Sequence, residues 1–493
     1  MPEPGDERTA RRLIMRGGWS SAAGFAVRLA ARLIFLLVAA RLYGPALFGA
    51  YLIALAIVEA AVVIAGLSMK RLLFQWLDGE DTDRAPFHVV LDACLLGGGA
   101  SLVVGAVIMI AVLLAPAELI APASAEALFI LAPTILVQVL LDVLLAATRW
   151  THAIRYEVVA RSLVQAWIGA LGAILFFAAG FAAQGLALAY WTGTLAALLY
   201  ALWGARHCFG SFGLASWRPR LRGLRARVLG MSSNTAEEFA GTLYGRIDIY
   251  LVGIMLGEAA AGIYGMARQI SVPIRQIRQG FDGLLIPIVS RTLATTGTEP
   301  TGKAIASAGR VIIAIQLPLL LALVALGVPL LSWFGPVFAA GYWALIALTA
   351  AELIQSAFGI GDLLFAWQRP KTGLAITLAS ALIGIVAGLL LIPALGITGA
   401  GLSVLLSFSA RAVFRRQVLR SQLGVHPPFV LLAPLLGAAA AGAATIMALN
   451  HIAAYPAVQA LGGLAAYGVV LATWLKATGI RLSFDGFVAR APE

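Results

Sequence analysis

The sequence predicts an all-α polytopic membrane protein with about 14 transmembrane helices. Of its 493 residues, 61% are hydrophobic and only 12% are charged, whereas a soluble protein carries about 25% charged residues. The mean hydropathy is +0.93. The apolar residues also fall into blocks of about 20, the length of helix that spans a hydrocarbon core of roughly 30 Å.

Fourteen such blocks follow one another along the chain. The first is too long and too rich in arginine for a cleavable signal sequence, so we expect it to remain as the first span. The predicted spans are 20–40, 46–67, 88–114, 126–147, 157–179, 186–205, 232–256, 259–282, 309–333, 342–367, 373–393, 398–416, 429–450 and 456–475.

The basic residues are distributed unevenly between the gaps. Most of the 35 Lys and Arg residues lie in the termini or in gaps after even-numbered spans, and the gap at 206–227 alone holds six arginines. The gaps after odd-numbered spans contain only Arg41. Because cytoplasmic loops carry the excess of basic residues, both termini are expected to be cytoplasmic. The net charge of +12 is then a topology signal, and a nucleic-acid partner is not expected.

The gaps on the outer side are short, and the longest, 115–125, has eleven residues. No extracytoplasmic domain is therefore expected, and the function must reside within the membrane. The two cysteines, Cys94 and Cys208, lie far apart without a neighbouring Cys or His. We expect neither a metal site nor a cofactor.

The chain contains an internal repeat. The segments "GPALFGAY" (44–51) and "GEAAAGIY" (257–264) share the pattern G-x4-G-x-Y, each at the predicted outer turn of a helical hairpin. A second pair, 183–189 and 398–404, recurs at nearly the same offset. Small-residue turns between apolar helices resemble one another, but the common offset favours duplication into two like-oriented lobes, a transporter architecture. The predicted parts are an N-terminus (1–19), an N-lobe (20–205), a basic linker (206–231), a C-lobe (232–417), two further spans (418–480) and a tail (481–493).

Arginines occur within several predicted spans. In the eighth span the polar positions follow steps of 3 and 4, which places them on one helical face: Tyr264, Arg268, Ser271, Arg275, Arg278 and Asp282. The first span has a shorter stripe of Ser21, Gly24, Arg28 and Arg32, and the seventh contributes Asn234, Glu237, Glu238, Arg246 and Asp248. Five such arginines exposed to lipid cost about 12 to 17 kcal/mol, so we expect them to face a wet or ligand-filled cavity.

Simpler roles remain open for some of these side chains. Arg278 and Arg275 can extend to the cytoplasmic interface, while Arg246 with Asp248, or Arg161 with Glu157, can form plain ion pairs. Arg28 and Arg32 have no acid in their own span, and Glu59 of the second span is the nearest candidate partner. Guanidinium stays charged and donates in pairs to phosphate oxygens, so several arginines around one cavity predict a site for a diphosphate headgroup.

Three segments resemble the polysaccharide transporter family, the Wzx-type flippases of lipid-linked oligosaccharides. They are 41–73, the run "DIYLVGIMLGEAAAGIYGMARQI" with its continuation to 293, and "LLIPALGITGAGLS" (390–403). The resemblance implies the multidrug and toxin extrusion type of fold, with two six-helix lobes. It also implies flipping of undecaprenyl-diphosphate-linked oligosaccharides to the outer leaflet by alternating access, without enzymatic activity. The residues that match the cavity arginines of related flippases, by location rather than by a strict motif, are Arg28, Arg32, Arg268 and Arg275.

The resulting site hypothesis has three parts. The predicted diphosphate ligands are Arg28, Arg32, Arg246, Arg268, Arg275 and Arg278. The candidates for coupling to H⁺ or Na⁺ are Glu237, Glu238, Asp248 and Glu59, since the paired glutamates depart from a purely cationic cavity; transport driven by the membrane potential is the other option. The candidate sugar contacts are Tyr244, Tyr264 and Asn234.

The expected partners are the lipid-linked oligosaccharide, membrane lipids and polysaccharide assembly proteins, in a bacterial inner membrane. The nearest rival is a drug or cation antiporter on the same fold, which should carry acids in its first helices. A polysaccharide polymerase or glycosyltransferase should show a large outer loop or an acidic pair in the first outer loop, and neither is present.

Overall fold

The computed structural model describes residues 27–80, 84–116, 120–210, 216–220, 235–295, 297–358, 370–425, 433–452 and 455–478. Every regular element within these ranges is a helix. Ten helices in them are long and apolar enough to cross a membrane, or twelve if each of two broken pairs forms one span. The protein is therefore an all-helical, multi-pass membrane protein, as the sequence predicts, while the count of about 14 spans stays a prediction.

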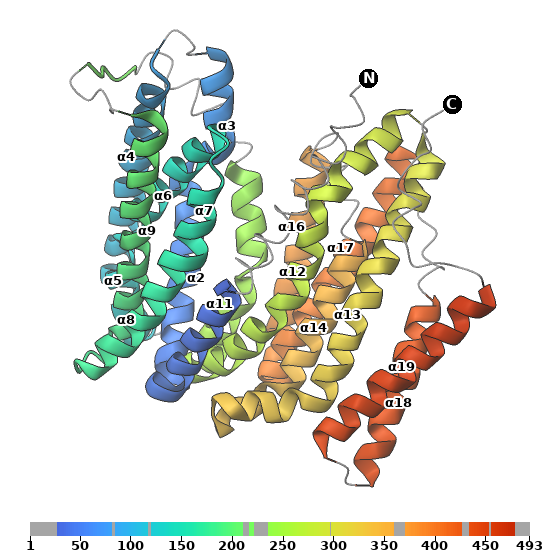
Figure 1. The fold of residues 1–493 in the computed structure, drawn as a ribbon. Coiled ribbons are helices and arrows are strands. Elements are labelled where there is room, and N and C mark those ends of the chain that lie inside the picture. The colour runs from blue at the N-terminus through green and yellow to red at the C-terminus, as the bar shows by residue number, and fades with distance from the viewer. Residues whose placement is uncertain are drawn as a thin grey trace. The chain divides into compact units, whose positions relative to one another are not determined.

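Two predicted spans fall outside that count for physical reasons. Helix α12 (Glu258–Thr295) carries three of the predicted arginines, which lower its hydropathy. The first two spans form one run of 40 helical residues, Val27–Gly66, which at 1.5 Å per residue is about twice the thickness of the hydrocarbon core. The run contains a π-helical segment, η1 (Ala39–Tyr43), and turns at Gly44, where φ is +75° and ψ is 176°. Helix α2 (Gly44–Gly66) begins there and leaves at an angle to the preceding helix (Figure 1).

The chain divides into two compact units, residues 1–246 and 247–493. The predicted lobe boundaries, with a linker at 206–231 and two appended spans, stay a prediction. After α2, the first unit contains a helix at Thr235–Tyr244 and α3 (Met69–Gln75), η2 (Trp76–Glu80), α4 (Pro86–Leu114), α5 (Pro122–Leu131), α6 (Thr134–Trp150), α7 (Arg155–Val159), η3 (Ala160–Gln165), α8 (Ala166–Ala178) and α9 (Gly185–Phe209). Helices α5 and α6 meet at an angle of 43° across a short break, where Pro133 lacks the amide hydrogen that a continuous helix needs.

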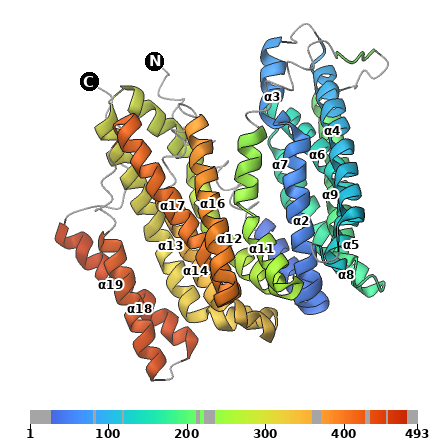
Figure 2. The same cartoon turned by 180° about the vertical axis from the view of Figure 1, so that it is seen from behind.

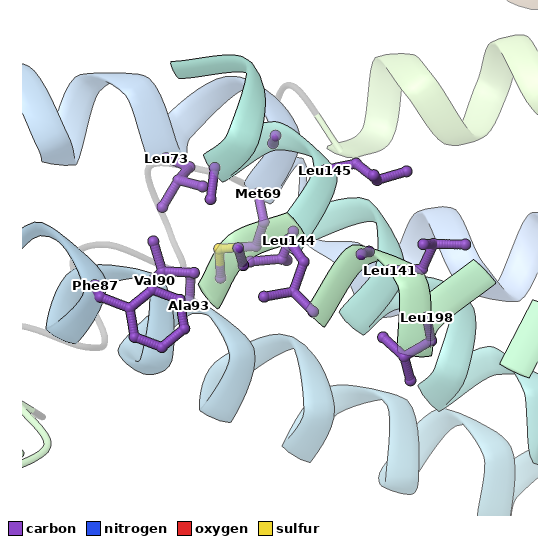
Figure 3. Packing of buried hydrophobic residues seen from close by; sticks show 14 of the residues in the cluster. Met69, Leu73, Phe87, Val90, Ala93, Leu141, Leu144, Leu145 and Leu198 are labelled. Carbon is purple, nitrogen blue, oxygen red and sulfur yellow. The ribbon is translucent and has the colours of Figure 1, made fainter. Parts of the chain in front are cut away.

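The core of the first unit lies where α3, α4, α6 and α9 meet. Aliphatic and aromatic side chains fill it, and Figure 3 shows Leu73, Phe87, Leu141 and Leu198 among them. Each of these four side chains is less than 10% exposed. This core holds α3 against α6, which matters for the polar groups that the two helices also share.

The outer face of α4 is strongly apolar and uncovered. Leu102, Val103, Leu113 and Leu114 are each more than 60% exposed. A soluble protein rarely leaves so continuous an apolar surface in contact with water. This face is suited to lipid, which agrees with a membrane-spanning helix.

The second unit is also a helical bundle, and Figure 2 shows it from behind. Its other elements are α11 (Ile247–Leu256), α13 (Thr298–Phe334), η4 (Pro336–Gly341), α14 (Tyr342–Phe358), α16 (Pro370–Leu395), α17 (Ile397–Leu423), α18 (Ala433–His451) and α19 (Pro456–Thr478). Helices α18 and α19 pack on α13, where Leu317, Leu321, Leu435 and Ile446 form a shared core.

Candidate functional site

One face of the first described helix lines a cavity of about 240 Å³ in the first unit. The side chains on this face are Arg28, Ala31, Arg32 and Phe35. Their spacing of 3, 1 and 3 residues keeps them on a single side of the helix. The stripe that the sequence predicts for the first span therefore faces a cavity, and its other two members, Ser21 and Gly24, lie outside the described residues.

The rest of the cavity wall comes from four other elements. Tyr51 of α2 and Tyr190 of α9 contribute aromatic rings, and Arg161 and Gln165 come from the π-helical segment η3. The ring centroid of Phe35 lies 5.9 Å from that of Tyr51. π-Helical turns are rare in proteins, and many of those that do occur lie at functional sites. A cavity with cationic, amide and aromatic groups is equipped for a polar ligand that also has apolar or sugar surfaces.

Small residues let η3 and α8 approach α9 closely beside this wall. A Cβ atom on Gly193 of α9 would lie 2.7 Å from the carbonyl oxygen of Gln165 and 3.1 Å from the amide nitrogen of Gly169. Close backbone contact through glycine is a common means of packing transmembrane helices. The position of Gln165 in the wall thus depends on the missing side chain at Gly193.

All the charged side chains that line the cavity are cationic. Three of its lining residues are arginines, and none of the ten lining residues carries a carboxylate. The Arg161 guanidinium is held from the protein side by Asp142, at 2.5 Å from Nη2, and by Glu157, at 3.8 Å from Nε. The predicted i,i+4 pair of Arg161 and Glu157 is therefore present, but Arg161 also belongs to the cavity wall.

Arg246 forms an ion pair within the first unit, with 2.7 Å between its Nη2 and Oε2 of Glu59. The alternative pairing of Arg246 with Asp248 is therefore wrong, because each has a different partner. Glu59, the candidate partner of Arg28 and Arg32, forms its described ion pair with Arg246 instead.

Two of the predicted arginines in the second unit meet carboxylates. Arg268 is 8% exposed and donates to Asp248, which also accepts a hydrogen bond from Tyr264. Arg275 lies 3.7 Å from Glu352 of α14, a buried carboxylate whose Oε2 has no hydrogen bond to the described residues. Arg278 is partly buried on the same helix, while the side chain of Asp282 is outside the described part. The described polar side chains of the stripe on α12 are therefore buried or half-buried.

The other candidates lie in varied surroundings. Tyr264 has no exposed surface and Tyr244 is 8% exposed, so neither offers much area to a sugar in this conformation. Glu238 lies 3.5 Å from the hydroxyl of Ser68, Glu237 precedes it on the same helix, and Asn234 is outside the described residues. The roles of all these residues stay predictions.

The structure thus unites Arg28 and Arg32 with residues that the sequence hypothesis does not include. Arg161 is missing from the sequence-based site hypothesis because Glu157, four residues earlier, offers a local explanation of its charge. The sequence does contain one indication of a site near Arg161. Gln138 and Asp142 are polar residues four apart inside an apolar span, a pattern that indicates a buried polar network. Across the described residues, no group of three or more His, Cys, Asp or Glu side chains is placed to hold a metal ion.

Comparison with known proteins identifies the family. Residues 38–335 match the family described as "Polysaccharide biosynthesis protein", a range that includes Arg161, Tyr51 and Tyr190 and begins after Arg28 and Arg32. The chain is also 21% identical over 261 residues to the "Probable low-salt glycan biosynthesis flippase Agl15" of Haloferax volcanii. That match spans 52% of this chain and 53% of the relative, about half of each.

Solved structures share the fold at low sequence identity. The inward closed conformation of the lipid II flippase MurJ superposes with a TM-score of 0.70 and 12% identity, over 93% of this chain and 99% of that chain. An inward-facing multidrug resistance MATE family transporter of the MOP superfamily gives 0.62 and 13%, over 81% and 98%. Because the family match covers more than half of the chain, the protein belongs to the polysaccharide biosynthesis protein family, and it has the fold seen in the MurJ and MATE structures.

Proposed function

We propose that this protein is a flippase that moves an undecaprenyl-diphosphate-linked oligosaccharide from the inner to the outer leaflet of a bacterial cytoplasmic membrane, and that it is not an enzyme. The observation that carries the proposal is the cavity lined by Arg28, Arg32 and Arg161 without a carboxylate. Guanidinium groups keep their charge where water is scarce and bind phosphate oxygens in pairs. The aromatic rings of Tyr51 and Tyr190 supply flat surfaces beside them for a sugar.

The family and its relatives support this substrate class. The matched family is one of polysaccharide biosynthesis, the Haloferax relative is described as a glycan biosynthesis flippase, and MurJ is described as a flippase of lipid II. The first two names refer to polysaccharide or glycan biosynthesis, and the third belongs to a lipid II flippase that shares the fold of this chain. Alternating access between inward- and outward-facing states is the transport mode that we expect.

A drug or cation antiporter is the rival function, and the MATE fold alone does not separate the two. The cavity supports the flippase, because a cationic ligand would meet three guanidinium groups and no carboxylate among its described lining residues. A polymerase or glycosyltransferase has less support, since nothing in the cavity resembles an acid–base pair. We therefore expect an anionic headgroup as the ligand.

The membrane potential can contribute a driving force. With a negative interior, moving two negative charges outward gains about 4.6 kcal/mol per 100 mV, at roughly 2.3 for each charge. Two of the candidate ion-coupling acids, Glu59 and Asp248, are already ion-paired with arginine. A coupling cation would have to displace a guanidinium there, so Glu237 and Glu238 are the better candidates if an ion is coupled.

A flipping assay in proteoliposomes tests the proposal. With a polyprenyl-diphosphate-linked sugar, we expect Arg28→Ala/Arg32→Ala to slow flipping at least about tenfold, since each lost charged hydrogen bond contributes about 1.5–3 kcal/mol. The lysine pair Arg28→Lys/Arg32→Lys should retain part of the activity, because charge remains but the planar fork does not. Arg206→Ala, at the exposed end of α9, is the matched control and should flip at the unmodified rate. Unchanged flipping by the alanine pair would exclude this cavity as the diphosphate site.

A further inference from the structure

A buried carboxylate lies behind the cavity wall and joins it to a second helix. Asp142 of α6 is 5% exposed and accepts contacts from two cations: Nη2 of Arg161 at 2.5 Å and Nζ of Lys70 at 2.6 Å. Nε2 of Gln138 donates to the same carboxylate at 3.1 Å. Arg161 lines the cavity, whereas Lys70 lies on α3 and is 42% exposed. One negative charge is thus divided between a cavity residue and a cation outside the cavity.

The network extends along the cavity wall through amides. Nε2 of Gln165 lies 3.4 Å from Oε1 of Gln138 and 3.3 Å from the hydroxyl of Thr194. Gln165 and Arg161 both line the cavity, and both are tied to α6 through Gln138 or Asp142. These bonds fix the orientation of the polar wall, and Asp142 accepts from both Arg161 and Gln138 within it.

The other end of the network sits at a constrained part of the backbone. Leu67 and Ser68, between α2 and α3, have φ of +47° and +52°, a conformation that costs a non-glycine residue about 1 kcal/mol or more. Lys70 lies two residues after Ser68, beside a void of about 10 Å³ that Asp142 and Glu238 also line. Such a backbone persists only where its surroundings fix it. The position of Lys70 against Asp142 is therefore set by the fold.

The guanidinium of Arg161 is engaged on one side only. Its Nη2 and Nε face Asp142 and Glu157, while its Nη1 makes no hydrogen bond or ion pair with the described residues. An arginine has five N–H donors, so donors remain for a ligand in the cavity. How strongly they attract an anion depends on how much of the Arg161 charge Asp142 compensates, and Lys70 competes for that same carboxylate.

We propose that Asp142 is a positioning residue that orients Arg161 in the cavity wall and, through its shared contact with Lys70, sets the affinity of the cavity for a prenyl diphosphate. This inference rests on the proposed function and adds a determinant of its affinity. It predicts opposite effects for the two partners. Loss of the Asp142 charge leaves Arg161 less compensated and strengthens anion binding. Loss of Lys70 turns the whole Asp142 charge toward Arg161 and weakens anion binding.

Equilibrium binding of farnesyl diphosphate to the full chain in lipid nanodiscs measures these effects. We expect Asp142→Asn to lower the Kd about fivefold or more, in the range of typical coupling between sites. Lys70→Met should raise the Kd roughly threefold, since one charge acts through a shared partner. In the Asp142→Asn background, Lys70→Met should change nothing, because its effect passes through Asp142. Flipping by Asp142→Asn should slow while its affinity rises, since a tightly held headgroup leaves slowly.

The matched control is Asp92→Asn. Asp92 is another 5% exposed carboxylate of the same unit, bonded to Arg84 at 2.6 Å and to Trp217 at 2.9 Å, and it does not line the cavity. The Kd of the Asp92→Asn variant for farnesyl diphosphate should stay at the unmodified value. A general effect of losing a buried acid would instead shift the Kd of both variants, Asp92→Asn and Asp142→Asn. If Asp142→Asn does not fold, the partly exposed Lys70 still gives the predicted weakening on its own.

The outcomes separate this inference from the function on which it rests. If the unmodified chain does not bind farnesyl diphosphate, or binds it equally after Arg28→Ala/Arg32→Ala, both proposals are overturned. If binding needs those arginines but the Lys70 and Asp142 effects share one sign, are absent, or add independently in the double variant, only the role of Asp142 is overturned.

Discussion

An arginine in an apolar helix needs a compensating group, and the predicted arginines of this protein find two different kinds. Arg246, Arg268 and Arg275 each meet a carboxylate, at Glu59, Asp248 and Glu352. Arg28 and Arg32 line a cavity together with Arg161, which also meets the carboxylate of Asp142. The first arrangement stabilises a charge within the fold, and we propose that the second offers charge to a ligand. The two classes therefore predict different consequences of mutation.

The buried pair of Arg268 and Asp248 should govern stability. Asp248→Ala leaves the Arg268 guanidinium buried without its carboxylate, which should cost about 3–5 kcal/mol of unfolding free energy. Replacing both partners by apolar residues, Asp248→Leu/Arg268→Met, should recover most of that loss, because neither charge of the pair then remains buried. Thermal unfolding in detergent measures both variants. A double variant as unstable as the single one would show that the pair does not act through charge compensation.

The sequence predicts part of this residue-level picture. The helical spacing of Arg28 and Arg32 correctly gives their common face. The partner of Arg246 could not be found in this way, because Glu59 is distant in sequence and only the packing of α2 brings it near. The local pair of Arg161 with Glu157, left open by the sequence, is present, but spacing along one helix shows nothing of the cavity formed by its neighbours.

Helices and turns were more predictable than contacts between them. Predicted span 88–114 agrees closely with α4, 186–205 with α9 and 456–475 with α19, because apolar length fixes a span. The π-helical segments and the break between α5 and α6 could not be predicted from hydropathy, since both depend on local backbone geometry. The duplication of lobes stays a prediction, although the first glycines of its repeated motif, Gly44 and Gly257, share a positive φ of 75° and 87°.

Gly44 should be needed for its backbone conformation alone. A Cβ atom there would meet nothing within 4 Å, so Gly44→Ala removes no space and only strains a φ of +75°. We expect a loss of about 1 kcal/mol or more in stability, measured by thermal unfolding. Gly99→Ala, in the middle of α4 with equally open surroundings and ordinary helical φ, is the matched control and should cause no loss. Equal effects at both positions would mean that the turn at Gly44 is not conformationally demanding.

At the scale of the whole molecule, composition, family and fold agree. A chain with 12% charged residues forms helices whose apolar faces, such as that of α4, are left for lipid. The family match and the fold of MurJ and MATE structures describe a membrane protein of polysaccharide biosynthesis. The proposed activity adds to this a cationic cavity in the first unit that takes the diphosphate of a lipid-linked sugar. Cytoplasmic termini and a bacterial inner membrane remain part of that proposal.

Protection of a cysteine in the cavity tests this central claim most directly. The sequence has only Cys94 and Cys208, so Ala166→Cys in a Cys94→Ser/Cys208→Ser background places a single thiol in the cavity wall. The rate of its modification by a thiosulfonate reagent is measured with and without ligands. We predict that a polyprenyl-diphosphate-linked sugar slows the modification and that a lipophilic cationic drug does not. Protection by the cation with none by the lipid diphosphate would contradict the account.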